Sequence, residues 1–407
     1  MINHFQRLFL ISYFPLFFIG VELSNQLDVS WMKGILLFPA VVFGFYSFLL
    51  HILNKQKISK NLFLLILLQL LYGSFYLNHK YSLFLSVIIT FLLIGNVLFY
   101  YFILQSNVYK NNLDLLIYDF FKSVFICFFL TTIVPLYIIQ DYKQFSDLGS
   151  AYNAKDVMFY MTTLNAPFLA AITMIYSFYI IYYKSQKFNL LYWVSFLLSF
   201  VSLILYSRRG PLFAALFILL LLVQKKLLYR VNIFHLFFIM LAPFYWDFIS
   251  LLLIEITQNN LVDSFIARND AGTYLSATGR TYIWFNAINF MTNFDSMHFI
   301  GYGGMPNFLL TQTPLNHAHN GLFELFFESG LIVVFIFLVI FTNVSLKIKA
   351  NLTNDFFILF FALVIYWTIL SMTEPTLRFT YFTGMFIIAL ISTVNSFIDL
   401  KKLNNYE

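Results

Sequence analysis

Apolar residues fill this chain in long runs, and short polar segments separate each run from the next. A helix that crosses a membrane needs about 20 mostly apolar residues. Twelve segments meet or approach this length, and we expect a transmembrane helix in each. They are residues 5–22, 34–53, 61–78, 81–104, 118–140, 157–183, 188–206, 211–224, 231–256, 321–346, 355–372 and 379–398. Polar residues rather than a cleavage site of small residues follow the first run, which favours a helix over a removed signal peptide.

This pattern predicts an all-α polytopic membrane protein in three parts. Residues 1–256 hold helices one to nine, residues 257–320 form one large polar loop, and residues 321–407 hold the last three helices and a tail. Composition agrees, because only 10% of the residues are charged, against about 25% in soluble domains. The single cysteine, Cys127, excludes an internal disulfide framework and a cysteine-based metal site.

The lysines predict the orientation. Thirteen fall in loops on the side of the N-terminus, and four (Lys33, Lys80, Lys143 and Lys155) fall on the other side. Lysine is enriched in cytoplasmic loops, so we expect both termini in the cytoplasm and the large loop outside. The net charge of +6 is spread over these short loops rather than gathered in a patch, which argues against nucleic acid as a partner.

The arginines show the opposite distribution. Five of the seven fall on the predicted outer side: Arg208, Arg209, Arg268, Arg280 and Arg378. A guanidinium group grips phosphate or carboxylate in a bidentate manner that lysine does not match. We therefore expect an anionic ligand at this face, with phosphate as the first candidate. The alternative is that they pair with acids of the loop such as Asp263, Asp270 and Asp295.

The stretch LYSRRGPLFAALF, residues 205–217, interrupts an apolar run with two adjacent arginines. Charges at membrane depth are costly and mark functional sites. Pro211 suits the first position of the next helix, whose N-terminus also attracts anions. We expect Arg208 and Arg209 to form part of a phosphate site. The alternative is that both side chains extend to lipid headgroups.

In the large loop, GRTYIWFNAINFM (residues 279–291) mixes apolar and polar positions as an amphipathic helix does. Arg280 would lie in its first turn, where a cation opposes the helix dipole, and this favours a role in ligand binding. The sequence GYGG at residues 301–304 predicts a turn with close backbone approach.

The stretch HAHNGLFELFFESG, residues 317–330, gathers scarce ionisable side chains at the start of the tenth helix. Asn320 is a suitable N-cap, and the i, i+4 spacing of Glu324 and Glu328 puts both on one helix face. Histidine as a residue type has a near-neutral pKa, so His319 is a candidate general base or acid. A metal site built on His317 and His319 lacks a firm third ligand, so no metal is expected.

The last polar stretch is TEPTLRF, residues 373–379. It forms a short outer turn between the eleventh and twelfth helices. Arg378 either joins the anion site or pairs with Glu374, and the sequence leaves both open.

These pieces, in this order, resemble the superfamily of O-antigen ligases and polymerases. The carrying stretches are SRRGPLFAAL, GR-TYIW, GYGG and HAHNGLFELFFESGL. The family pattern of His, a small polar residue, nine further residues and Gly corresponds to His319, Asn320 and Gly330. Val333 stands where the pattern continues with a second small residue.

The resemblance implies a metal-independent, cofactor-free glycosyltransferase of the inner membrane with a GT-C-like fold and a periplasmic site. Its donor would be an undecaprenyl-pyrophosphate-linked glycan. Arg208, Arg209 and Arg280, with Arg378, would bind the pyrophosphate, and His319 would deprotonate the acceptor hydroxyl. His317, Asn320, Glu324 and Glu328 would support them.

The first expectation for function is a polymerase of lipid-linked repeat units of O-antigen or capsular polysaccharide, with a chain-length regulator protein as a further partner. The second is an O-antigen ligase that transfers glycan onto lipid A-core. A transporter or flippase of lipid-linked sugars is the third, although no internal repeat is visible and the ionisable residues cluster at one boundary.

Overall fold

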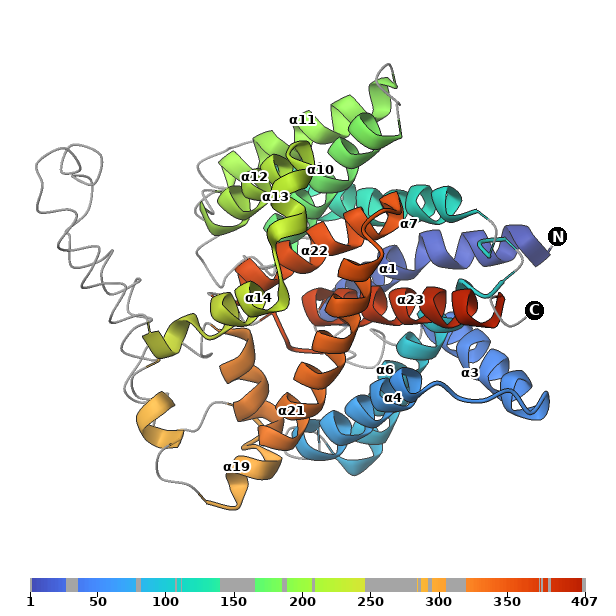
Figure 1. The fold of residues 1–407 in the computed structure, drawn as a ribbon, viewed down its shortest axis with the longest axis vertical. Helices are drawn as coiled ribbons and strands as arrows, with labels where there is room; N and C mark the ends of the chain where they lie inside the picture. Colours follow the sequence, from blue (N-terminus) through green and yellow to red (C-terminus); the bar gives the residue numbers. More distant parts are fainter. Residues whose placement is uncertain are drawn as a thin grey trace, which may run out of the picture.

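The architecture comes from a computed structural model of the 407-residue chain (Figure 1). The residues it describes are 2–26, 36–77, 82–106, 108–110, 112–139, 165–184, 189–206, 209–245, 284, 287–291, 295–304, 320–372, 374, 376–379 and 382–404. Within these ranges every regular element is a helix and there is no strand. The predicted all-α class is therefore confirmed.

The described residues form the following helices in chain order. They are α1 (Ile2–Gln26), α3 (Phe38–Leu53), α4 (Lys60–Tyr72) with the π-helical turn η1 (Gly73–Leu77), α6 (Leu83–Ile103), α7 (Leu113–Phe128) with the π-helical turn η2 (Phe129–Ile133), α8 (Val134–Ile139), α10 (Asn165–Tyr183), α11 (Leu190–Leu205), α12 (Arg209–Val223), α13 (Lys225–Arg230), α14 (Ile233–Met240), α19 (Met297–Ile300), α21 (Gly321–Ala350), α22 (Asp355–Ser371) and α23 (Phe382–Asn404).

Each of the twelve predicted segments contains helix. In the described residues, five helices are long and apolar enough to cross a membrane: α1, α6, α10, α21 and α23. Five shorter helices, α3, α4, α11, α12 and α22, are also apolar. The chain is thus a helical membrane protein, while the count of twelve spans and the GT-C-like arrangement stay predictions. The ninth segment, 231–256, contains the eight-residue helix α14, and residues 246–256 lie outside the described ranges.

Small polar side chains mark where the apolar helices begin. Ser59 accepts a hydrogen bond from the backbone N–H of Leu62 at the start of α4. Asn189 does the same for α11 and Asn354 for α22. Such caps satisfy N–H groups that have no partner inside the helix. They explain why helices begin at these breaks in an otherwise apolar sequence.

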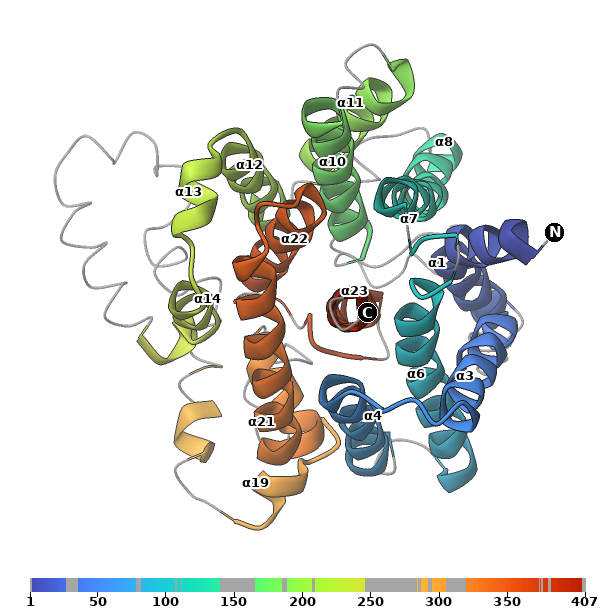
Figure 2. The same cartoon turned by 45° about the vertical axis from the view of Figure 1, so that its right-hand side comes forward.

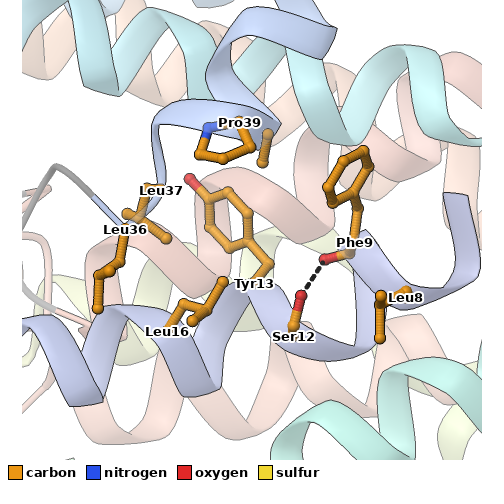
Figure 3. A pocket seen from close by; sticks show the side chains of 9 residues that line it. Leu8, Phe9, Ser12, Tyr13, Leu16, Leu36, Leu37 and Pro39 are labelled. Atoms are coloured by element: carbon orange, nitrogen blue, oxygen red, sulfur yellow. Dashed lines mark hydrogen bonds between the residues drawn. The ribbon is translucent and has the colours of Figure 1, made fainter. Parts of the chain in front are cut away.

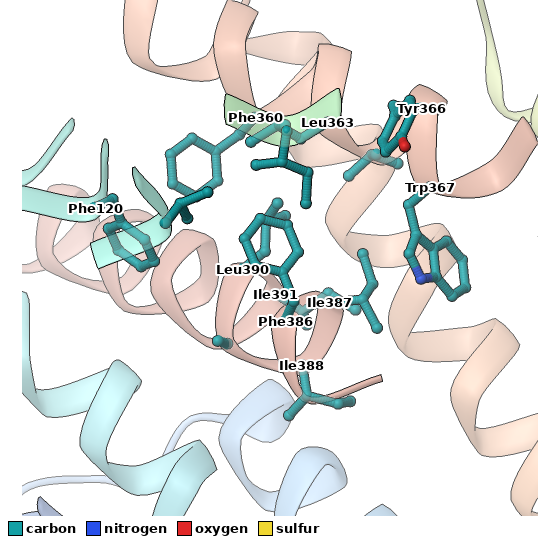
Figure 4. Close-up of a cluster of buried hydrophobic side chains, with 14 of the residues drawn as sticks. Phe120, Phe360, Leu363, Tyr366, Trp367, Phe386, Ile387, Ile388, Leu390 and Ile391 are labelled. Carbon is teal, nitrogen blue, oxygen red and sulfur yellow. The ribbon is translucent and has the colours of Figure 1, made fainter. Parts of the chain in front are cut away.

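Three helices form the centre of the bundle. Nearly every residue of α22 is buried, and α10 and α23 are mostly buried as well. Figure 2 shows α23 enclosed by α4, α6, α10, α21 and α22. Figure 4 shows Phe360, Leu363 and Trp367 of α22 facing Phe386 and Leu390 of α23. A helix that is apolar on every side belongs in such an interior.

The outer helices turn large apolar side chains outward. Phe84 of α6, Leu190 of α11 and Phe213 of α12 are each more than 60% exposed, as expected of lipid-facing positions. Helices α3 and α6 approach closely at two glycines. A Cβ on Gly44 would lie 2.7 Å from the Phe99 nitrogen, and one on Gly95 would lie 2.5 Å from a Val41 methyl group. Small residues allow this close contact in membranes.

Charged side chains gather at one end of the bundle, which we call the charged end. Arg7 pairs with Asp119 at 2.8 Å, and Lys184 pairs with Asp114 at 2.7 Å and with Asp355 at 3.6 Å. The start of α1 and the end of α23 lie at this same end (Figure 1). Cys127, the single cysteine, is buried in α7.

Candidate functional site

The structure describes four of the nine predicted site residues in full: Asn320, Glu324, Glu328 and Arg378. Arg209 is the first residue of α12. The sequence predicted Pro211 at the first position of this helix, and the helix begins two residues earlier. The other four, His317, His319, Arg208 and Arg280, lie outside the described residues. Their predicted roles therefore stay predictions, and the site is built from the residues around them.

Asn320 forms the N-cap of α21 and also ties this helix to two others. Its side-chain oxygen accepts hydrogen bonds from the backbone N–H groups of Leu322 at 3.0 Å and Phe323 at 3.1 Å. Its amide nitrogen donates to the carbonyls of Met372 at 3.2 Å and Met240 at 3.4 Å. The predicted cap is confirmed. The residue directly after His319 is thus fixed to the ends of α14 and α22.

Helix α21 bends sharply at Gly330. This residue has φ +78° and ψ 176° inside an otherwise helical run, a conformation that glycine adopts without steric cost. The bend divides α21 into a half-helix, residues 321–329, and a longer part, residues 331–350. Every residue of the half-helix is buried.

The bend brings the GYGG turn against α21. A Cβ on Gly330 would lie 2.3 Å from the Phe299 carbonyl oxygen, and one on Gly301 would lie 2.6 Å from the Ser329 backbone. The carbonyl of Phe327 accepts hydrogen bonds from the N–H groups of Tyr302 at 2.7 Å and Gly304 at 3.3 Å. The predicted close backbone approach of residues 301–304 is confirmed, and its partner is the half-helix.

The described part of residues 279–291 packs on the half-helix through apolar side chains. Trp284 and Ala287 are buried against Phe323, Phe326 and Phe327. The apolar side chains of the predicted amphipathic segment that the structure describes thus pack on the protein itself. Trp284, four residues after Arg280, is a large buried side chain that the sequence pattern did not single out.

Asp295, His298 and Tyr302 form a polar cluster directly after this segment in the chain. His298 is fully buried, its Nδ1 lies 2.9 Å from Asp295, and its ring stacks on Phe290. The hydroxyl of Tyr302 donates to Asp295 at 2.9 Å. The hydrogen bond with His298 and those from Tyr302 and backbone N–H groups lower the pKa of Asp295 below its ordinary 3.8. Burial and the bond to Asp295 raise the pKa of Tyr302. This cluster holds the turn that contacts Phe327.

On its other side, the half-helix carries the predicted pair of glutamates, and both face one cation. Arg378 forms an ion pair with Glu324 through Nη2 and with Glu328 through Nε, the latter at 2.9 Å. Tyr72, from α4, donates a 2.9 Å hydrogen bond to the second oxygen of Glu328. Both glutamate side chains are 1% exposed and that of Arg378 is 14% exposed. We call Tyr72, Glu324, Glu328 and Arg378 the ionic cluster.

The sequence left Arg378 between an anion site and Glu374. The structure places Arg378 between Glu324 and Glu328. Glu328 also accepts a hydrogen bond from Tyr72, 256 positions earlier in the chain. Tyr72 was not predicted, because a tyrosine near a helix end is expected at the membrane interface. The predicted contact of Arg378 with pyrophosphate stays a prediction.

Within the described residues, no group of three or more His, Cys, Asp or Glu is arranged to hold a metal ion. A cavity of about 260 Å³ lies between α1 and the start of α3 (Figure 3). Its lining, which includes Leu8, Tyr13 and Leu37, is apolar apart from two hydroxyl groups and shares no residue with the ionic cluster.

The chain was compared with families of known proteins. Residues 193–338 match the family model described as O-antigen ligase. The predicted resemblance to the superfamily of O-antigen ligases and polymerases is confirmed over this stretch. Neither a curated protein nor a solved structure was found to match the chain.

The matched stretch runs from α11 into the second part of α21. It contains Arg208, Arg209, Arg280 and His319, whereas Arg378 and Tyr72 lie outside it. The O-antigen ligase family match, with the apolar helices, supports a membrane protein of O-antigen and lipopolysaccharide biosynthesis, and a ligase- or polymerase-type activity.

Proposed function

We propose that this protein is a membrane glycosyltransferase that joins undecaprenyl-pyrophosphate-linked repeat units into O-antigen or a related surface polysaccharide. The observation that carries the proposal is the family match over residues 193–338. The matched stretch contains Arg208, Arg209 at the start of α12, Arg280, and His319, which directly precedes the N-cap Asn320.

The proposed reaction is a displacement at the anomeric carbon of the donor sugar. An acceptor hydroxyl forms the new C–O bond while the bond to pyrophosphate breaks, and the pyrophosphate leaves with the bonding electrons. His319 takes the proton from the hydroxyl, a step worth roughly 10²–10⁴-fold in rate. Arg208, Arg209 and Arg280 stabilise the charge that develops on the leaving pyrophosphate. No metal or cofactor enters the proposal.

The site is proposed to face the periplasm from the inner membrane, with the charged end in the cytoplasm. This orientation rests on the lysine distribution. With this orientation, Arg208, Arg209 and the large loop would lie on the side where lipid-linked glycans would be joined. A chain-length regulator protein is proposed as a partner because the resemblance to the polymerases implies one.

The second candidate is an O-antigen ligase, which the description of the matched family favours. The donor, the arginines and the base have the same roles, and only the acceptor differs. A polymerase transfers to another lipid-linked glycan, whereas a ligase transfers to lipid A-core.

Purified protein in lipid vesicles tests both candidates. Supplied with lipid-linked repeat unit alone, a polymerase lengthens it, whereas a ligase acts only when lipid A-core is added. His319→Ala should abolish either product, and His235→Ala, which alters a histidine at the capping box of α14, should not. Normal chain length with His319→Ala would refute the assignment of the base.

A further inference from the structure

We infer that Arg378 is a positioning residue, whose guanidinium holds the half-helix of α21 in place and so sets where His319 enters the site. The inference rests on the proposed function for the role of His319. It assigns Arg378 a role different from that of Arg208, Arg209 and Arg280, which are proposed to bind pyrophosphate.

The half-helix needs its own contacts because the bend at Gly330 separates it from the rest of α21. Helical hydrogen bonds hold a straight helix in line, but φ +78° at Gly330 turns the chain out of that line. The direction of residues 321–329 is therefore set by what they touch. Apolar packing from Trp284 and Ala287 fixes one side, and the ionic cluster fixes the face that carries Glu324 and Glu328.

Arg378 is well placed to serve as that contact because its own backbone is fixed. It lies in the short connection between α22 and α23. A Cβ on Gly384 would lie 2.2 Å from the Arg378 carbonyl oxygen, so the connection lies directly on the first turn of α23. On the other side, a Cβ on Gly321 would lie 3.1 Å from Thr376 and 3.5 Å from Leu377. The connection thus joins the start of α21 to the buried centre of the bundle.

The charges of the cluster also favour this role. One guanidinium lies between two carboxylates, so its positive charge is already neutralised. A pyrophosphate that approached Arg378 would also approach the two buried carboxylates that already face it, and the repulsion between like charges is strong in a protein interior.

The depth of the cluster strengthens the argument. Helix α4 rises about 18 Å from Lys60 to Tyr72, and α23 rises about 22 Å from Asp399 to Gly384, at 1.5 Å per residue. Lys60 and Asp399 lie toward the charged end, where Tyr101 contacts both Ser59 and Asp399. The ionic cluster therefore lies about 18 Å along α4 from the charged end. Its burial makes the pairing of Arg378 with carboxylates important, because an unpaired charge in a protein interior is strongly unfavourable.

The half-helix connects the ionic cluster to the proposed catalytic base through the chain. Glu324 lies one turn after the N-cap Asn320, and His319 precedes that cap directly. A small shift of the half-helix would move the backbone at Asn320, to which His319 is directly bonded in the chain. A misplacement of about 1 Å can lower a rate about 100-fold without removing any substrate contact.

Steady-state kinetics on lipid-linked donor in vesicles test the inference. Arg378→Ala should lower kcat by about 10- to 100-fold while the KM for donor changes by less than about threefold. Tyr72→Phe, which leaves Arg378 in place, should lower kcat more mildly, again without raising KM. Tyr101→Phe is the matched control, since it removes a tyrosine bond to Asp399 at the charged end and should leave kcat unchanged.

A rise of about tenfold or more in the donor KM with kcat retained would overturn the inference and make Arg378 a ligand of the anion. Equal losses from Tyr72→Phe and Tyr101→Phe would also contradict it. If Arg378→Ala does not fold, the comparison of the two tyrosine variants still decides.

A readout without catalysis separates this inference from the proposed function. The melting temperatures of Arg378→Gln, Glu324→Gln and the double variant form a cycle. The double variant should be less destabilised than the sum of the two single variants if the ion pair holds the half-helix. Additive losses would refute the positioning role. Absence of transferase activity in the wild type would instead refute the proposed function and leave the cycle valid.

Discussion

The backbone N–H of Tyr302 donates a 2.7 Å hydrogen bond to the carbonyl of Phe327, and so joins the GYGG turn to the half-helix of α21. The contact requires glycine on both sides, because the backbones at Gly301 and Gly330 approach too closely for a side chain. The glycine of the family pattern, Gly330, thereby acquires a structural reason.

Gly330→Ala should destabilise the protein and abolish activity. The new methyl group would face the carbonyl of Phe299 at 2.3 Å, and the positive φ adds about 1–3 kcal/mol of backbone strain. Thermal unfolding in detergent measures the loss. Gly210→Ala is the control, since nothing lies within 4 Å of a Cβ there, and its melting temperature should stay near that of wild type. Equal melting temperatures for the two variants would contradict the tight packing at Gly330.

Asn320→Ala should cost more than the loss of an ordinary helix cap. A cap alone is worth about 0.5–2 kcal/mol, and Asn320 also tethers Met240 and Met372. Asn189→Ala, which removes the cap of α11 at an exposed site, provides the comparison in the same unfolding experiment. A loss at position 320 no larger than that at position 189 would show that the two tethers add nothing.

Trp284→Ala should lower stability by about 3–5 kcal/mol, the range for removing a large buried aromatic side chain. Trp284 is 1% exposed, whereas Trp193 of α11 is 42% exposed. Trp193→Ala should therefore have a much smaller effect on the unfolding midpoint. Similar effects of the two substitutions would mean that Trp284 is not an anchor of the loop.

Asp295→Asn should produce a loss of stability that depends on pH. The native pKa of Asp295 lies below its ordinary 3.8, so its charge stabilises the fold above that value. This contribution disappears as the pH falls through the native pKa. The melting temperatures of wild type and variant should differ at pH 7 and converge below about pH 4. A difference that stays constant with pH would refute a contribution from the charge.

Arg280→Lys should strongly reduce transfer if the proposed grip on pyrophosphate is bidentate, since lysine keeps the charge but not the fork geometry. The expected signature is a fall in kcat/KM of about 10-fold or more, measured with the lipid-linked donor in vesicles. Full activity of the lysine variant would indicate that the charge alone matters.

Local patterns made much of this fold predictable. The apolar runs predicted helix in all twelve segments, and Asn320 was recognised as a cap because its partners lie two and three residues away. Long-range relations were not accessible in the same way. Tyr72 and Glu328 meet only because α4 packs on α21, and nothing near either residue signals the other. The ion pairs of Arg378 with the glutamates of α21 likewise depend on how α21 packs against the connection between α22 and α23.

The burial of Cys127 has a practical consequence. A thiol reagent added to the folded protein finds no accessible native thiol, because the chain has one cysteine and it is buried in α7. A cysteine introduced at position 319 or 280 would therefore be the one labelled site. Its rate of labelling, with and without lipid-linked donor, would report directly on which of these positions the substrate covers.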